Sequence, residues 1–211
     1  MNRRPCAIVI SGGGSNMAAL LAAMADPAYP AECRLVVSNR PDAGGLAKAV
    51  AAGVATAVED HRAHPDRDGF DRALAARLDA CGAELIVLAG FMRRLTPWFV
   101  NRYRDRLVNI HPALLPSYRG LRTHEGALAD GVAIHGCTVH LVREEVDAGP
   151  ILAQGAVRVL AGDTPATLAA RVLRMEHQLF PLALAAYAEG RLRMEGDRLV
   201  GQPIALFDAE G

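Results

Sequence analysis

The first half of this chain alternates short apolar segments with alanine-rich segments, and this alternation restricts the possible folds more than any other feature. The apolar segments are rich in β-branched residues or leucine and are expected to be strands: Cys6–Ile10, Arg34–Val37, Thr56–Val58 and Leu85–Leu88. The segments between them are expected to be helices: Asn16–Ala25, Gly45–Ala52 and Asp68–Cys81. Apolar strands separated by helices are typical of a parallel sheet covered on both faces. With right-handed crossovers, the pattern predicts a Rossmann-like, doubly wound, mostly parallel α/β sheet.

The second half has a different pattern, which predicts an antiparallel part of the fold. A strand and a proline-containing loop are followed by a short helix and two further strands: Leu107–His111, Pro112–Arg122, Glu125–Asp130, Ala133–Val142 and Ile151–Val159. The segment between the last two strands, Glu144–Pro150, contains Asp-Ala-Gly-Pro and is a strong turn signal.

A long helix is expected to begin after Thr164, a good N-cap, with Pro165 at its first position. Its apolar residues step by four and three along one face: Leu168, Val172, Met175, Leu179 and Leu182. Pro181 has no amide hydrogen, so it is expected to kink or divide this helix. The tail, Arg191–Gly211, is interpreted as a short hairpin and a loose end. Because no repeat or linker interrupts the chain, a single domain over residues 1–211 is expected.

The composition excludes several classes of partner. Lys and Arg together number 23, as do Asp and Glu, so the net charge is zero and gives no general attraction to nucleic acid or to an anionic membrane. The four cysteines form no Cys-x-x-Cys pair, which argues against a zinc knuckle or a dithiol redox site and for a reducing compartment. No segment is long and apolar enough to span a membrane. We therefore expect a cytoplasmic protein, a monomer or a homodimer, without a metal.

The segment Ser11–Asn16 is a candidate anion site between the first strand and the first helix. Its glycines let the backbone approach a ligand, and amides at a helix start attract an anion. Ser15 and Asn16 can add side-chain donors or cap the helix. Met17 stands where the dinucleotide fingerprint requires glycine, so a single phosphate is favoured over NAD. A flexible turn with a helix cap is the alternative interpretation.

Three polar residues are candidates for chemistry. Asn109 and His111 share one side of their strand, near the carboxyl edge of a parallel sheet, where such folds bind ligands. Asp147 lies in the later turn, where a purely structural role is the alternative. Together an amide, an imidazole and a carboxylate suit acyl transfer to an amine without a covalent intermediate. Asn109 and a protonated His111 can donate to the tetrahedral oxyanion, and Asp147 can relay the amine's proton through water.

Six motifs in order resemble those of a known family: Ser11–Asn16, Leu88–Arg93, Asn109–Pro112, Leu114–Pro116, Gly136–Val139 and Val146–Pro150. The chain closely resembles the phosphoribosylglycinamide formyltransferase family, folate-dependent enzymes of purine synthesis, over essentially its whole length. The resemblance implies a phosphate-binding half over about residues 1–100 and a folate-binding, catalytic half over about 101–190. It also implies 10-formyltetrahydrofolate as co-substrate and glycinamide ribonucleotide as acceptor.

The resemblance assigns site residues one by one. The catalytic trio falls on Asn109, His111 and Asp147. The residues implied to contact the ribonucleotide are Gly14, Ser15, Asn16, Met17 and Glu176. The residues implied to contact the folate are Arg67, Met92, Arg93, Arg94, Leu95, Asn109, Arg143, Glu144, Glu145, Val146 and Asp147. Without the resemblance, Arg67 is interpreted as a solvated charge, Met92 and Leu95 as packing residues, and Glu176 as part of a surface ion pair.

Three other functions compete with this one. A formyltetrahydrofolate deformylase would use much the same trio with water in place of the amine, usually behind an additional regulatory domain. A methionyl-tRNA formyltransferase would require a C-terminal nucleic-acid-binding domain and a basic surface. A non-catalytic nucleotide-binding protein would need the glycine-rich loop alone. The phosphate loop and the polar trio together favour the transferase.

Overall fold

The computed structural model describes residues 3–208. The chain divides into two compact units, Met1–Asn109 and Ile110–Gly211. The boundary falls inside strand β5 (Leu107–His111), so the first three residues of this strand belong to the first unit. The expectation of one domain over residues 1–211 stays a prediction.

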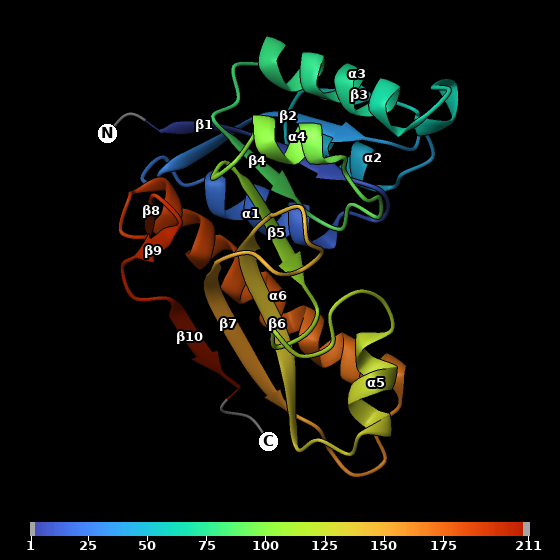
Figure 1. The fold of residues 1–211 in the computed structure, drawn as a ribbon, viewed down its shortest axis with the longest axis vertical. Coiled ribbons are helices and arrows are strands. Elements are labelled where there is room, and N and C mark those ends of the chain that lie inside the picture. Colours follow the sequence, from blue (N-terminus) through green and yellow to red (C-terminus); the bar gives the residue numbers. More distant parts are fainter. Residues whose placement is uncertain (1–2, 209–211) are drawn as a thin grey trace. The chain divides into compact units, whose positions relative to one another are not determined.

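The first unit is a parallel sheet with helices, as Figure 1 shows. Its elements are β1 (Arg4–Ile10), α1 (Ser15–Met24), β2 (Ala31–Ser38), α2 (Gly45–Ala51), β3 (Thr56–Val58), the 3-10 helix η1 (His61–Ala63), α3 (Arg67–Ala80), β4 (Leu85–Leu88) and α4 (Pro97–Arg102). The strand order is β5-β4-β1-β2-β3, and every neighbouring pair is parallel. Right-handed crossovers place α1 and α2 on one face and α3 and α4 on the other. The predicted Rossmann-like sheet is confirmed.

Helix α4 is absent from the sequence prediction, although its start carries a recognisable signal. Thr96 is the N-cap and accepts a hydrogen bond from the amide of Phe99, and Pro97 follows at the first helical position. The buried carboxylate of Asp71 on α3 accepts from the amide of Thr96 at 2.6 Å and from its hydroxyl at 2.7 Å. This contact attaches the start of α4 to α3.

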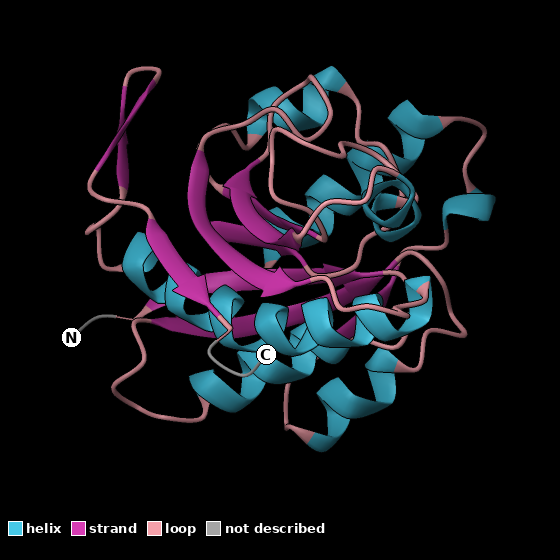
Figure 2. Cartoon of the chain, turned by 90° about the horizontal axis from the view of Figure 1, so that it is seen from below, coloured by secondary structure: helices cyan, strands magenta, loops and turns pink. Residues whose placement is uncertain are grey.

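The second unit contains the predicted antiparallel part. Its elements are α5 (Thr123–Ala129), β6 (Ile134–Leu141), β7 (Ile151–Arg158), α6 (Pro165–Ala188), β8 (Arg193–Glu195), β9 (Arg198–Val200) and β10 (Ile204–Phe207). Strands β6 and β7 pair antiparallel, and α6 packs on both. Strands β8 and β9 form a ribbon of their own, which Figure 2 shows apart from the larger sheet.

The structure corrects two predictions in this unit. Pro181 does not divide the long helix, which is continuous over Pro165–Ala188. Residues on both sides of Pro181, including Leu179 and Leu184, are buried, and this packing outweighs the loss of one helical hydrogen bond. The tail is not a loose end over Ile204–Phe207, because these residues form β10 and pair parallel with β7. The predicted hairpin is confirmed as β8 and β9, whereas residues 209–211 lie outside the described residues.

Two glycines allow β6, β7 and α6 to approach closely. A Cβ atom on Gly136 would lie 1.9 Å from the carbonyl oxygen of Gly155, and one on Gly155 would lie 2.4 Å from Cγ of Met175. The first contact involves backbone, which cannot move aside without displacing a strand. Glycine at position 136 is therefore required by packing.

We expect Gly136→Ala to lower the free energy of unfolding by about 1–3 kcal/mol or more, because the new methyl group overpacks the strand pair. The matched control is Gly44→Ala, since a Cβ at Gly44 meets nothing within 4 Å and its backbone is already in the right-handed helical region. Urea denaturation of both variants measures the difference. Equal stability of Gly136→Ala and the parent protein would contradict the close packing of β6 on β7.

Candidate active site

The glycine-rich segment forms a cavity in the first unit. Gly14 has a left-handed backbone (φ 64°) and is the N-cap of α1, and no side chain caps this helix. The first amides of a helix have no carbonyl four residues earlier in the helix, which is why a helix start favours an anion. The cavity has a volume of about 260 Å³ and is lined by Gly12, Gly13, Gly14, Ser15, Asn16, Lys48, Ala89 and Gly90. Met17 is fully buried and is not part of this lining.

A backbone contact between two helix starts shapes this cavity. The amide of Gly45 donates to the carbonyl of Gly12 at 3.0 Å. A Cβ atom on Gly14 would lie 2.9 Å from Cα of Gly45, and one on Gly45 would lie 2.5 Å from Cδ1 of Ile10. Gly14, with its left-handed backbone, is required for the loop to pack against the beginning of α2, whereas a Cβ atom at position 45 would require the Ile10 side chain to move.

Ser11 connects this loop to the segment that the resemblance assigns to folate. The amide of Ser11 donates to the carbonyl of Gly90 at 3.2 Å, and its buried hydroxyl accepts from the amide of Met92 at 2.8 Å. Met92 is 70% exposed and could therefore contact a ligand, whereas Leu95 is buried.

Of the predicted folate residues in this unit, Arg93 is brought to α3. Its guanidinium carbon lies 5.2 Å from the ring centroid of Phe70, a cation–π arrangement. Arg67 is the exposed first residue of α3, the helix that carries Phe70, and Arg94 is also exposed. Asn109 is half-buried on β5, where it is the register partner of Leu88.

In the second unit, the structure brings His111 and Asp147 together. Nδ1 of His111 lies 3.4 Å from Oδ2 of Asp147, and both side chains are largely buried, at 6% and 11% exposed. Nε2 of His111 lies 2.8 Å from the carbonyl oxygen of Tyr118. A carbonyl only accepts, so Nε2 carries the hydrogen in this contact. The amide of Gly120 donates to Oδ2 of Asp147 at 2.9 Å and fixes the carboxylate.

A second histidine lies on the other side of the same carboxylate. Nε2 of His140 is 3.7 Å from Oδ1 of Asp147, and Nδ1 of His140 contacts the carbonyl of Leu141 at 3.1 Å. Burial lowers the pKa of His140 to about 4, although the charge of Asp147 acts in the opposite direction. His140 is therefore neutral at pH 7, and Asp147 is flanked by one buried neutral ring.

The remaining predicted residues of this unit lie in the turn and on α6. Arg143 is half-buried, whereas Glu144, Glu145 and Val146 are exposed, and Glu145 forms an ion pair with Arg119. Glu176 on α6 is buried at 6% exposure, so its interpretation as a surface ion pair is wrong. The pKa of the Cys137 thiol is raised by burial and further by Glu176, which indicates that this carboxylate lies near β6.

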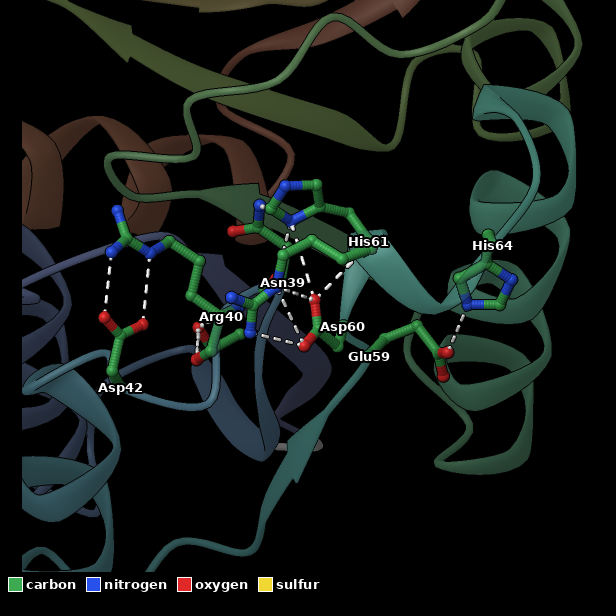
Figure 3. Close-up of polar contacts among 9 residues, drawn as sticks. Asn39, Arg40, Asp42, Glu59, Asp60, His61 and His64 are labelled. Carbon is green, nitrogen blue, oxygen red and sulfur yellow. Dashed lines mark hydrogen bonds and ion pairs between the residues drawn. The ribbon is translucent and has the colours of Figure 1, made fainter.

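A further polar cluster was not predicted. It comprises residues 38–42 and 59–64 at the carboxyl ends of β2 and β3, where Figure 3 shows Arg40 directed at Asp42 and His64 at Glu59. Nη2 of Arg40 lies 2.8 Å from Oδ2 of Asp42, and Nε2 of His64 lies 2.7 Å from Oε1 of Glu59. Because these side chains pair with one another within the two loops, we interpret the cluster as structural.

Sequence reasoning also missed the hydrogen bond between the Ser11 hydroxyl and the amide of Met92, and the position of Lys48 in the cavity lining. Lys48 is the only lysine in the chain and follows the helix start at Gly45 by one turn, a signal that could have identified it. No comparable signal exists for the Ser11 hydroxyl, because its contact with Met92 joins residues 81 positions apart.

Comparison with known proteins identifies the family. A family model described as formyl transferase matches residues 4–184. The chain belongs to the formyl transferase family. The chain is 43% identical to the phosphoribosylglycinamide formyltransferase of Escherichia coli K12, over 94% of this chain and 97% of that protein.

Two further relatives extend the comparison within the formyl transferase family. The chain is 45% identical to the human trifunctional purine biosynthetic protein adenosine-3 over 89% of its own length, but it spans only 19% of that relative. The solved structure of the phosphoribosylglycinamide formyltransferase from Coxiella burnetii superposes with a TM-score of 0.91 at 40% identity, covering 97% of this chain and 100% of that one. The resemblance stated from the motifs is thus confirmed.

Within residues 3–208, no helix has the length and apolar composition needed to cross a membrane. In the same residues, no three or more His, Cys, Asp or Glu side chains are grouped so that they could hold a metal ion.

The buried histidines of the second unit predict how stability depends on pH. Burial, with His124 nearby, lowers the pKa of His135 to about 4, as burial does for His140. Histidine in the unfolded chain has a pKa of about 6.5, so between these values the unfolded state binds more protons than the folded state. The free energy of unfolding must therefore decrease as the pH falls through this window.

We expect each buried ring to cost of the order of 3 kcal/mol of stability on acidification from about pH 6.5 to about pH 4, at about 1.4 kcal/mol per pKa unit. His135→Asn removes one titrating ring, so its stability should decrease less steeply than that of the parent protein. Urea denaturation at a series of pH values measures both slopes. Equal slopes for the two proteins would show that the pKa of His135 in the folded protein is the same as in the unfolded chain, and would contradict this prediction.

Proposed function

We propose that the chain transfers the formyl group of 10-formyltetrahydrofolate to the amine of 5-phosphoribosylglycinamide, giving formylglycinamide ribonucleotide and tetrahydrofolate. The family, and 43% identity to a phosphoribosylglycinamide formyltransferase along nearly the whole of both chains, support the reaction. The observation in the structure that carries the proposal is the buried contact between His111 and Asp147, 3.4 Å apart, from segments 36 residues apart (147 − 111).

The ribonucleotide phosphate is proposed to bind in the glycine-loop cavity, at Gly14, Ser15, Asn16 and the backbone of Met17. Open space at Gly12 and Gly13, where a Cβ atom would meet nothing within 4 Å, supports the entry of a ligand. Buried Glu176 is proposed to contact the glycinamide part of the same substrate.

The folate is proposed to bind against Arg67 and the segment Met92–Leu95, and to contact Asn109 and the turn Arg143–Asp147. Two observations support this location: the Met92 side chain is exposed, and a hydrogen bond from its amide to the Ser11 hydroxyl fixes the backbone of the segment. The family accounts for formyl transfer, and the donor chemistry requires no metal.

The chemistry proposed for the trio follows from its residue types. The amine nitrogen bonds to the formyl carbon, and the carbonyl oxygen becomes an oxyanion that accepts hydrogen bonds from Asn109 and from protonated His111. Nε2 of His111 donates to the carbonyl of Tyr118 at 2.8 Å, so the hydrogen on Nδ1, which lies 3.4 Å from Oδ2 of Asp147, is the one proposed to reach the oxyanion. Asp147 accepts the proton of the attacking amine through water, and the bond from the formyl carbon to the folate nitrogen then breaks as that nitrogen is protonated.

We further propose that the protein acts in the cytoplasm, as a monomer or homodimer, and binds neither nucleic acid nor membrane. The balanced charge of the chain, 23 basic and 23 acidic residues, supports the absence of both partners.

We expect Asn109→Ala and His111→Ala each to lower turnover by roughly a hundred- to a thousand-fold, because each removes one oxyanion donor. Asp147→Asn should also reduce turnover and change its pH profile, since the amide cannot take up the proton. Absorbance of the folate product measures turnover, and circular dichroism checks the fold. Asn101→Ala and His64→Ala are controls outside the trio and should be fully active. Near-normal turnover in all three trio variants would exclude the proposed mechanism.

A second measurement separates the transferase from a deformylase. We expect folate release to depend on the ribonucleotide acceptor, because the amine and not water is the nucleophile. Formate is assayed with and without acceptor in otherwise identical mixtures. Rapid formate production without acceptor would favour the deformylase, and nucleotide binding with no folate turnover would favour a binding protein.

A further inference from the structure

Lys48 lies at the mouth of the glycine-loop cavity. Its ammonium nitrogen donates to the carbonyl oxygen of Gly13 at 2.7 Å, and its side chain is part of the cavity lining. The other described residues of that lining are glycines, Ala89, Ser15 and Asn16, so Lys48 supplies the only formal charge among them. No role was assigned to it from the sequence or from the family resemblance.

The position of Lys48 follows from the backbone contact between Gly14 and Gly45. Helix α2 begins at Gly45, packed directly against the loop, and Lys48 is three residues further along. Residues three apart on a helix lie on the same face, so the lysine is directed at the loop that Gly45 touches. The contact that closes the loop therefore also places the cation.

A cation stabilises a phosphate monoester that leaves water. The amides at the start of α1 offer hydrogen bonds and a partial positive charge, which does not neutralise a dianion. An ammonium group has three donors, and the bond to Gly13 uses one, so two can reach a phosphate in the cavity. Lysine binds phosphate as a point charge on a flexible stem, which suits an exposed rim.

We propose that Lys48 is the cationic contact of the acceptor's phosphate and selects phosphorylated over unphosphorylated acceptors. The proposal rests on the transferase function proposed above and concerns binding only. Lys48 touches no group that reacts. Its contribution is the same in the ground state and the transition state, so it should act on KM and leave kcat nearly unchanged.

The experiment compares Lys48→Met, which keeps the stem and removes the charge, with Lys48→Arg, which keeps a charge. We expect Lys48→Met to raise KM for the ribonucleotide about ten- to a hundred-fold, the loss typical of one hydrogen bond to a charged group, with kcat and KM for the formyl-folate nearly unchanged. Lys48→Arg should recover most of the affinity. Arg40→Met is the matched control, because Arg40 is paired with Asp42 and is not part of the cavity lining (Figure 3), and it should leave both constants unchanged.

Two further measurements distinguish a phosphate contact from a merely structural role of the Gly13 hydrogen bond. With unphosphorylated ribosylglycinamide as acceptor, kcat/KM should be the same in Lys48→Met and the parent protein. An equal loss for both acceptors would overturn the proposal, because it would mean that the variant disturbs the loop. Unchanged KM for the ribonucleotide in Lys48→Met would overturn it as well.

Binding of inorganic phosphate separates this inference from the proposed function. We expect phosphate to raise the thermal unfolding temperature of the parent protein and of Lys48→Arg, but to have a much smaller effect on Lys48→Met. This result without formyl transfer by the parent protein would support the phosphate contact and contradict the transferase. Formyl transfer by the parent protein, with equal phosphate stabilisation of all three proteins, would support the transferase and overturn the role of Lys48.

Discussion

The backbones of Gly14 and Gly45 are in direct contact, and the geometry of the candidate phosphate site depends on that contact. A Cβ atom on Gly14 would lie 2.9 Å from Cα of Gly45, so with any other residue at position 14 the loop after β1 could not close on α2 in this way. The same loop begins with Ser11, whose hydroxyl holds the amide of Met92. One close approach thus orders the end of β1, the first turn of α1, the start of α2 and, through Ser11, the segment after β4.

In the second unit, the turn between β6 and β7 also depends on a close backbone approach. Asp147 has a left-handed backbone (φ 52°), which aspartate tolerates better than most residues. Two residues later, a Cβ atom on Gly149 would lie 1.7 Å from the carbonyl oxygen of Leu141, so only glycine lets the turn fold back on the end of β6. The Asp-Ala-Gly-Pro sequence therefore acts as more than a turn signal. It directs the carboxylate inward between His111 and His140.

The fold could be predicted from local patterns, whereas several parts of the site depend on contacts distant in sequence. The alternation of apolar segments with alanine-rich segments was sufficient to predict strands β1 to β4. Thr164 and Pro165 were sufficient to predict the start of α6. Strand β10 was missed because a short segment becomes a strand only by pairing with β7. Lys48 contacts a residue 35 positions away, and its spacing of one turn from Gly45 indicates this only once Gly45 is known to touch the loop. The burial of Glu176 likewise depends on the packing of α6 against the strands.

The degree of burial separates the polar groups proposed for chemistry from the cation proposed for binding. His111 and Asp147 are largely buried, and each has fixed partners, so they are already oriented before a substrate arrives. Groups held in this way can stabilise a charge that exists only in the transition state, since no reorganisation is needed when it forms. Lys48 is exposed and bonded to one carbonyl, so its ammonium can follow a phosphate whose charge is the same throughout the reaction. Rigidity is needed where charge develops, and a flexible cation is sufficient where charge is constant.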